Sequence, residues 1–365
     1  MSKKILLSGY YGFDNVGDEA VLFSIVRDLR AVMGDEAEIT VLSNNPETTS
    51  ARYDVRAVDR WNKKTLLTEI KACDLFISGG GSLLQDVTSK NGVLYYLGLI
   101  ALAEHYHKPV LIYAQGIGPL KSSRNRLLTA KLLNKAAAIT VRDKESSDEL
   151  QAMGVNKAIT VTADPVLGLG RFGADGALGK EILSHYGWRE DKKSLAIALR
   201  PWGGSQNFVA ETAKACARMY QDGWQLLFLP MQQEQDGKIS AEAAEMVREI
   251  TNDTPIVLEE QLTPAEMVSV FQNVDMVIGM RLHALIIGAA LKKPIVGLSY
   301  DPKVAAFMES IKNGAYDDLA DVSVEDLLLH LSIAEGTAER GVNGDMIERA
   351  VYPAYLANEI LRGEY

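Results

Sequence analysis

The sequence has few cysteines, no excess of positive charge and no long apolar run. Its 365 residues include two cysteines, Cys73 and Cys216, which lie far apart and outside any metal-ligand pattern. This spacing argues against a disulfide framework or a zinc site, and we expect both thiols to fill apolar positions. The net charge of -10 argues against a nucleic-acid-binding face, which would need a basic patch.

No stretch of the chain approaches the ~20 apolar residues that a membrane span needs. We therefore expect a soluble, cytoplasmic protein, and peripheral contact with the inner face of the membrane stays open. The sequence also has no GxSxG nucleophile elbow, no HExxH motif and no carboxylate cluster with metal spacing. We predict that the protein uses no cofactor and no metal, and that its site works by general acid–base catalysis and electrostatic stabilisation.

Strand-like apolar runs alternate with amphipathic stretches in both halves of the chain, and this alternation predicts parallel, doubly wound sheets. The fold class that we predict is α/β, with two Rossmann-like domains facing a cleft. We expect an N-terminal domain over 1–172, a glycine-rich linker over 173–192 and a C-terminal domain over 193–365. A last helix at 344–362 could pack back on the first domain. The expected strands are 4–8, 38–42, 74–77, 109–114, 138–141, 158–161, 194–199, 225–230, 256–258, 276–279 and 294–298.

We expect the functional residues in the loops that follow strands, because ligands of open α/β sheets bind at the carboxyl ends of the strands. The first such loop, residues 9–19 (GYYGFDNVGDE), lacks the spacing of a dinucleotide or P-loop motif. We expect its aromatic residues Tyr10, Tyr11 and Phe13 to be exposed and to stack on a sugar. Asp18 and Glu19 have an alternative interpretation as favourable charges in the first turn of a helix.

The next two loops are rich in glycine as well. Residues 79–86 (GGGSLLQD) place three glycines and the hydroxyl of Ser82 after a strand, and residues 115–119 (QGIGP) occupy the same position one strand later. Such glycines suit either a backbone that approaches a ligand or a tight strand-to-helix turn. Arg142 and Arg200 each follow a strand of one domain, where an arginine can also form an ordinary surface pair.

The most specific segment is residues 277–284 (VIGMRLHA), in which Gly279 ends a strand and Arg281 and His283 follow in the turn. A histidine with an unperturbed pKa near ~6.5 can exchange protons at neutral pH, although a lone histidine is more often a core residue. Lys303 follows the next strand. These cations predict a site for a phosphate or carboxylate.

Six motifs in this order resemble the polysaccharide pyruvyl transferases, and among them the enzymes for cell-wall polymers of Gram-positive bacteria. They are 12–19 (GFDNVGDE), 79–86, 115–119, 141–146 (VRDKES), 163–166 (ADPV) and 279–283 (GMRLH). The resemblance implies a glycosyltransferase-B arrangement and a pyruvate ketal built on a sugar from phosphoenolpyruvate. The implied acceptor is an N-acetylmannosamine residue of a lipid-linked precursor.

The resemblance further implies that Arg281, His283 and Lys303 contact phosphoenolpyruvate beside Gly279, joined by Arg142 or Arg200. We hypothesise that His283 is the general acid and that Asp14 or Asp18 accepts the proton of the sugar hydroxyl. The residues that we expect on the acceptor side are Tyr11, Asn15, Gly80, Gly81, Ser82 and Gln115. The alternative enzyme is a glycosyltransferase that uses a nucleotide sugar, because fold does not fix function; a glycan- or nucleotide-binding module is a third possibility.

Overall fold

The structure is a computed structural model that describes residues 2–86, 92–172, 175–203, 207–312, 316–319, 321–336 and 342–365. The chain forms two compact units. Unit 1 contains Met1–Gly168 and Asp345–Tyr365, and unit 2 contains Leu169–Gly344. The division thus falls at Gly168, a few residues before the boundary expected at 172.

Unit 1 is built on a seven-stranded parallel sheet with the order β3-β2-β1-β4-β5-β6-β7. Its central strands are buried on both faces, as in a sheet covered by helices. The order reverses between β1 and β4, so the loops after these two strands open at a topological switch point. The strands are β1 (Lys3–Ser8), β2 (Ala37–Ser43), β3 (Arg56–Asp59), β4 (Leu75–Gly79), β5 (Val110–Gln115), β6 (Ala138–Val141) and β7 (Ile159–Val161).

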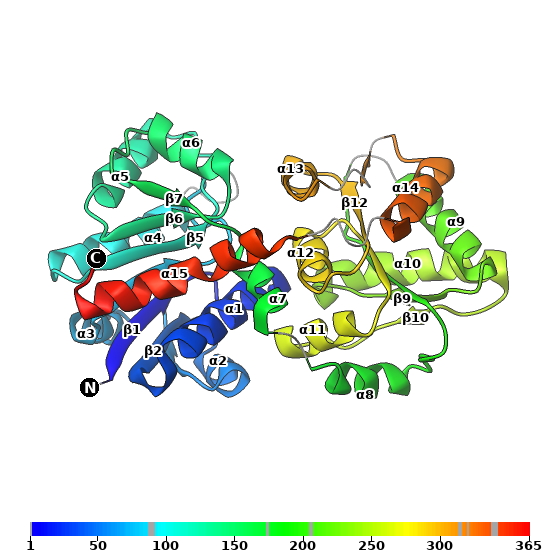
Figure 1. Cartoon of the computed structure of the whole chain (residues 1–365), viewed down its shortest axis with the longest axis horizontal. Coiled ribbons are helices and arrows are strands. Elements are labelled where there is room, and N and C mark those ends of the chain that lie inside the picture. Colours follow the sequence, from blue (N-terminus) through cyan, green and yellow to red (C-terminus); the bar gives the residue numbers. More distant parts are fainter. Residues whose placement is uncertain are drawn as a thin grey trace. The chain divides into compact units, whose positions relative to one another are not determined.

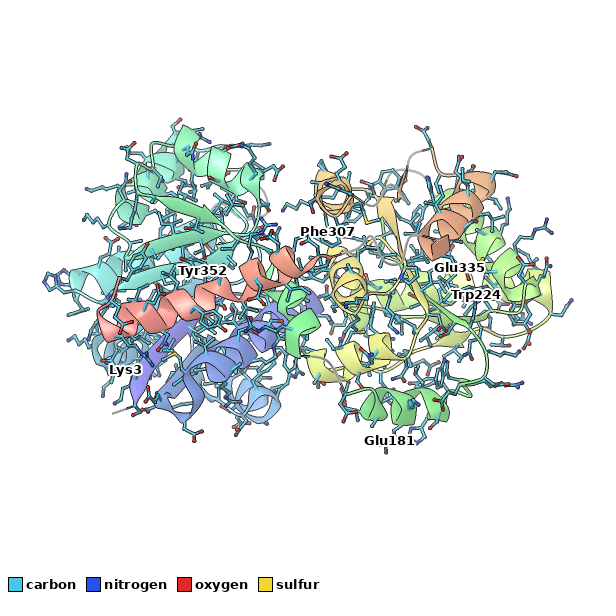
Figure 2. The ribbon with its side chains drawn as sticks, viewed as in Figure 1. Lys3, Glu181, Trp224, Phe307, Glu335 and Tyr352 are labelled. Carbon is cyan, nitrogen blue, oxygen red and sulfur yellow. The ribbon has the colours of Figure 1, made fainter. Side chains whose placement is uncertain are left out.

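Helices connect these strands, and a C-terminal helix returns to them (Figure 1). That helix, α15, buries Val351 and Ala354 while Tyr352 stays 38% exposed (Figure 2). Residues Asp345–Tyr365, which contain nearly all of this helix, belong to unit 1. The helices of unit 1 are α1 (Val16–Met33), η1 (Gly34–Glu36), α2 (Pro46–Tyr53), α3 (Lys63–Ala72), α4 (Gly92–His105), α5 (Ser123–Leu133), α6 (Lys144–Ala152), η2 (Pro165–Gly168) and α15 (Gly344–Arg362).

Unit 2 repeats the arrangement with a six-stranded parallel sheet in the order β10-β9-β8-β11-β12-β13. Its switch point lies between β8 and β11. The strands are β8 (Ser194–Ala198), β9 (Gln225–Phe228), β10 (Ile256–Val257), β11 (Met276–Gly279), β12 (Ile295–Ser299) and β13 (Tyr316–Asp318). The helices are α7 (Leu169–Phe172), α8 (Ala177–His185), α9 (Asn207–Gln221), α10 (Gln233–Thr251), α11 (Pro264–Gln272), α12 (Leu282–Ala290), α13 (Pro302–Ser310) and α14 (Val324–Gly336).

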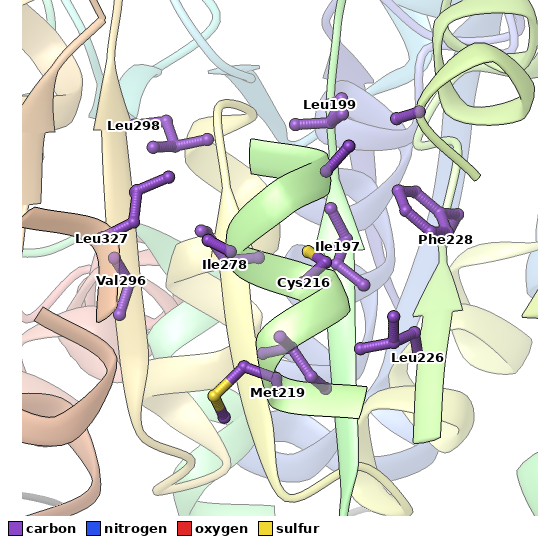
Figure 3. Packing of buried hydrophobic residues seen from close by; sticks show 14 of the residues in the cluster. Ile197, Leu199, Cys216, Met219, Leu226, Phe228, Ile278, Val296, Leu298 and Leu327 are labelled. Atoms are coloured by element: carbon purple, nitrogen blue, oxygen red, sulfur yellow. The ribbon is translucent and has the colours of Figure 1, made fainter. Parts of the chain in front are cut away.

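The core of unit 2 lies between its sheet and helices α9 and α14. Ile197 and Ile278 of the sheet pack against Cys216 and Met219 of α9, and Leu327 of α14 closes the same cluster (Figure 3). Cys216 is 1% exposed, and Cys73 in unit 1 is 3% exposed. Both free thiols are therefore apolar core residues, as expected.

The segment expected as a linker, 173–192, carries helix α8 of unit 2, while its residues 173 and 174 lie outside the described residues. The backbone N–H of Gly179 in α8 donates to Ser269 Oγ of α11 at 2.7 Å. A side chain at position 179 would collide with the backbone carbonyl of Ser269. This glycine therefore serves close helix packing rather than chain flexibility.

The α/β class with two doubly wound parallel sheets is confirmed. Helix α11 begins at Pro264, where the N-cap Thr263 forms a capping box with Glu266 in the first turn. Within the described ranges, no helix has both the length and the apolar character that crossing a membrane requires.

Candidate active site

The loop between β1 and α1 is fixed by helix capping and by a buried carboxylate. Asn15 is the N-cap of α1, and its side chain accepts from the N–H of Gly17 at 3.1 Å. The carboxylate of Glu19 accepts from the N–H of Gly12 at 2.7 Å and from the hydroxyl of Tyr53. Burial raises the pKa of Glu19. Glu19 therefore ties the loop to α2, and its role is structural.

A cavity of about 540 Å³ opens beside this loop, within unit 1. Its volume is in the range of small-molecule sites. Three residues predicted for the site, namely Asn15, Asp18 and Ser82, are part of its wall. The full lining is Tyr10, Phe13, Asn15, Asp18, Arg60, Trp61, Ser82, Leu83, Gln85, Gly92, Tyr95 and Tyr96.

The aromatic residues of the loop divide between the cavity and the core. Tyr10 and Phe13 stack with ring centroids 4.1 Å apart and planes 6° apart, and both line the cavity. Tyr11 is fully buried instead, and its hydroxyl donates to the carbonyl of Gly79 at 2.7 Å. The expectation that Tyr11 is exposed for a ligand was therefore wrong. Its ring turns inward beneath Gly9, where any side chain would collide with it.

The two candidate bases, Asp14 and Asp18, have different surroundings. The side chain of Asp14 is 61% exposed and lies 3.4 Å from Arg52 Nη1. Asp18 lines the cavity, where its Oδ1 accepts from the N–H of Gly81 at 3.4 Å. Burial is the main cause that raises the pKa of Asp18 to about 7, and the nearby carboxylate of Glu19 adds to it. A carboxyl with this pKa can accept a proton at neutral pH, as a general base must.

The glycine-rich loop after β4 contributes Ser82, Leu83 and Gln85 to the cavity wall, and the loop after β5 is hydrogen-bonded to it. The N–H of Gly116 donates to the carbonyl of Gly81 at 2.9 Å. A Cβ at Gly116 would come within 2.6 Å of Ser82 Oγ and 2.9 Å of Arg142 Nε, so glycine is needed there. Gly80 has a φ of +143°, which favours glycine. Gln115 is fully buried, and its amide donates to Ser78 Oγ at 3.1 Å, so the structure does not bring it to the cavity.

Arg142 follows β6 and is held by carboxylates. Its guanidinium lies 3.2 Å from Asp143 Oδ2 and 3.3 Å from Asp164 Oδ2, and its Nη2 lies 3.4 Å from Ser82 Oγ. Only 10% of the side chain is exposed. Arg142 therefore joins the loops after β4, β6 and β7 of unit 1 and reaches the hydroxyl of a residue on the cavity wall.

In unit 2, the loops after β8, β11 and β12 meet around Arg200. Its N–H approaches Met280 Sδ at 3.4 Å, and its Nη1 donates to the hydroxyl of Tyr300 at 2.7 Å. The Arg200 guanidinium also lies 4.7 Å from the centre of the Tyr300 ring. Arg200 therefore stands among the loops that carry the other predicted cations of unit 2.

Arg281, the residue before α12, holds a fully buried carboxylate. Its Nε and Nη2 lie 3.0 and 2.6 Å from the two oxygens of Asp236, whose side chain is 0% exposed. Nη2 also donates to Gln235 Oε1 at 3.3 Å. Arg281 therefore has a structural task in addition to the proposed ligand contact, and only Nη1 is left without a partner among the described residues.

His283 lies in the first turn of α12 and is half-buried. Lys303 is exposed in the first turn of α13, where its N–H donates to Asp301 Oδ1 at 2.9 Å. Gly279 ends β11, and a Cβ there would make only ordinary contacts, the nearest at 3.5 Å from Leu285 Cδ2. Packing therefore does not explain the glycine at position 279.

One wall of the cavity, which the sequence motifs did not predict, is formed by Arg60, Trp61, Tyr95 and Tyr96. Arg60 and Trp61 follow β3, a four-residue strand that was not predicted. Tyr95 and Tyr96 lie in α4, whose apolar sequence indicates a buried helix rather than a binding site. The one signal in the sequence was the adjacent Arg60 and Trp61 directly after a possible strand.

Solved structures similar to this chain share its fold at low identity. A putative UDP-N-acetylglucosamine 2-epimerase from Listeria monocytogenes is 15% identical with a TM-score of 0.68, covering 100% of this chain and 98% of that chain. UDP-GlcNAc 2-epimerase from Neisseria meningitidis is 12% identical with a TM-score of 0.64, covering 99% and 100%. E. coli ADP-heptose lps heptosyltransferase II is 13% identical with a TM-score of 0.54, covering 92% and 99%.

At the level of sequence, residues 15–302 match the family described as polysaccharide pyruvyl transferase. No curated protein matches the chain. The matched span includes Asp18, Arg142, Arg200, Arg281 and His283, and it ends one residue before Lys303.

Proposed function

Because the chain belongs to the polysaccharide pyruvyl transferase family, we propose that it builds a pyruvate ketal on a sugar. The donor is phosphoenolpyruvate, and inorganic phosphate is released. The acceptor that we propose is an N-acetylmannosamine residue of a lipid-linked cell-wall precursor, with the reaction taking place in the cytoplasm.

The observation that carries this proposal is the cavity of unit 1, which Asp18 lines together with aromatic rings. Stacked Tyr10 and Phe13 offer the flat apolar surface on which sugar rings pack. Asp18, with its pKa raised to about 7, can take a proton from a sugar hydroxyl near neutral pH. We therefore place the acceptor in this cavity and assign the base to Asp18 rather than to the exposed Asp14.

The loops of unit 2 supply cations for the donor. Phosphoenolpyruvate carries a carboxylate and a phosphate, and arginine matches either group with paired N–H donors. We assign the donor to Arg281 and Lys303, with His283 as the acid and Gly279 as the point of close backbone approach. The further arginine for the donor is either Arg142 of unit 1, which reaches Ser82 Oγ, or Arg200 of unit 2, beside Tyr300.

The proposed chemistry balances without a cofactor. His283 gives a proton to the methylene carbon of phosphoenolpyruvate, and positive charge develops at C2. A sugar hydroxyl attacks C2 and passes its proton to Asp18. The bond between C2 and the phosphate oxygen then breaks, and the electron pair leaves with the phosphate. A second hydroxyl attacks C2 and passes its proton to His283, which closes the ketal and restores the acid.

Phosphate release from phosphoenolpyruvate, measured with and without a β-N-acetylmannosaminyl acceptor, tests the proposal. We expect acceptor-dependent release in the wild type and a loss of about 10²–10⁴-fold in His283→Gln, the usual worth of general acid–base catalysis. His185→Gln is the matched control, because His185 is exposed on α8. Turnover of a nucleotide sugar with no release from phosphoenolpyruvate would favour a glycosyltransferase instead.

A further inference from the structure

The cavity of unit 1 contains a buried arginine that the proposed reaction does not use. Arg60 follows β3, is 3% exposed and belongs to the cavity wall. Its Nη1 donates to the carbonyl of Gly9 at 2.8 Å, and its Nη2 donates to the hydroxyl of Tyr96 at 3.3 Å. These contacts fix the guanidinium but involve no carboxylate.

Aromatic rings surround this guanidinium. Its central carbon lies 4.6 Å from the ring centre of Tyr95, 5.2 Å from those of Phe13 and Trp61, and 5.6 Å from that of Tyr96. Each ring face attracts a cation, more strongly where water is excluded. The rings therefore partly replace the water that Arg60 loses, and they leave its positive charge uncancelled.

Nearby carboxylates are engaged elsewhere. Asp59 accepts from the N–H of Trp61 at 2.8 Å, and Asp18 accepts from Gly81. Across the described part of the chain, Arg60 forms no ion pair, and its buried Nε has no hydrogen-bond partner. A buried cation without a counter-charge and a buried donor without an acceptor are both costly. An oxyanion in the cavity would supply the missing counter-charge.

We propose that Arg60 is an anion receptor, and that the sugar entering this cavity carries a phosphate or carboxylate group. The inference rests on the proposed function in so far as the cavity holds the acceptor. The rings of Tyr10 and Phe13 take the sugar face, and the guanidinium of Arg60 takes the negative group. Arg60 is thus a specificity-determining residue, which selects charged acceptors over neutral ones.

Calorimetric titration of the full chain tests this without any turnover. The ligands are N-acetylmannosamine, its 1-phosphate, its uronic acid and inorganic phosphate. At least one charged sugar should bind 10-fold or more tightly than the neutral sugar, and the comparison between the two charged sugars identifies the anionic group. Inorganic phosphate should compete with the charged sugar only weakly, because it lacks the ring that stacks.

The variant Arg60→Met keeps the length of the side chain and removes its charge. It should lose about 10- to 100-fold in affinity for the charged sugar, the worth of a hydrogen bond to a charged group, and little for the neutral one. Arg56→Met is the matched control, because Arg56 lies on β3 with a half-exposed side chain paired with Glu69 at 2.6 Å. Arg60→Lys, which keeps the charge without Nε, serves if the methionine variant does not fold.

Equal binding of the neutral and charged sugars to the wild type would overturn the proposal, as would an Arg60→Met variant that folds and keeps the preference. Ketal formation on a neutral acceptor with no anion preference would refute the anion receptor and leave the proposed function standing. Tight, Arg60-dependent binding of the charged sugar without any ketal formation would support the anion receptor and refute the proposed function.

Discussion

Replacing Asp18 by asparagine should abolish most turnover while making the protein more stable. Asparagine keeps an oxygen that can accept from the N–H of Gly81, so the loop contact at 3.4 Å can persist. It removes the proposed general base, and the expected loss in kcat is about 10²–10⁴-fold. The matched control is Asp14→Asn, because Asp14 lies in the same loop with a 61% exposed side chain. That control should keep kcat within about threefold of the wild type, since no proton transfer is lost.

The pH dependence of the wild type should report the same group. Asp18 must be ionised to act as a base, and its pKa is raised from 3.8 to about 7. The value of kcat/KM should therefore fall about tenfold for each pH unit below 7, as Asp18 becomes protonated. Stopped or continuous phosphate-release assays from pH 5 to 8.5 measure this limb, which Asp18→Asn should flatten.

The stability effect follows from the same raised pKa. The folded protein holds the proton of Asp18 more tightly than the unfolded chain does. Below pH 3.8 the carboxyl is protonated in both states, so its ionisation does not change the free energy of unfolding. As the pH rises from 3.8 to about 7, ionisation increasingly favours the unfolded state. About 3 units at 1.36 kcal/mol each give a cost on the order of 4 kcal/mol above pH 7.

Urea denaturation of the wild type and Asp18→Asn at pH 4 and pH 8 measures this cost. The variant should be the more stable protein at pH 8, and the difference should nearly vanish at pH 4. A variant that folds but turns over at the wild-type rate would refute the assignment of the base. A variant that is no more stable than the wild type at pH 8 would refute the burial of an ionised carboxylate.

Two further substitutions examine unit 2. Arg281→Met should lower the free energy of unfolding by about 3–5 kcal/mol, because it leaves the buried Asp236 unpaired. Adding Asp236→Leu should restore much of that stability in urea denaturation but not the affinity for phosphoenolpyruvate. Full recovery of affinity would show that Arg281 is only structural. Gly279→Ala should change the free energy of unfolding by less than about 0.5 kcal/mol, since the new Cβ has room. The same substitution should raise the KM for phosphoenolpyruvate. An unchanged KM would show that Gly279 is not part of the donor site.

The periodicity of the sequence predicted most of the sheets because buried parallel strands are continuous apolar runs. The strand expected at 138–141 is β6 as observed. The missed strands are short: in β3 only Val58 is buried, and β13 has three residues. The first turns of helix α10 carry polar residues such as Gln233 and Glu234, so apolar periodicity does not reveal where this helix begins.

The candidate site was harder to predict, because its walls come from distant parts of the chain. Arg60 and Tyr95 are 35 residues apart and meet only when β3 and α4 fold onto the same sheet. Which of three loop aromatics turns inward depends on the carbonyl of Gly79, 68 residues from Tyr11. The choice between Asp14 and Asp18 likewise depends on burial, which the local sequence does not encode.

The most direct test of the proposed reaction is an analysis of its product made in D₂O from phosphoenolpyruvate and a β-N-acetylmannosaminyl acceptor. We expect one phosphate per product, a sugar heavier by one pyruvate less one water, and a ketal methyl group that carries one solvent deuteron in the NMR spectrum. A product that keeps the methylene group of phosphoenolpyruvate, or an acceptor left unchanged while the folded protein binds phosphoenolpyruvate, would contradict ketal formation by this chain.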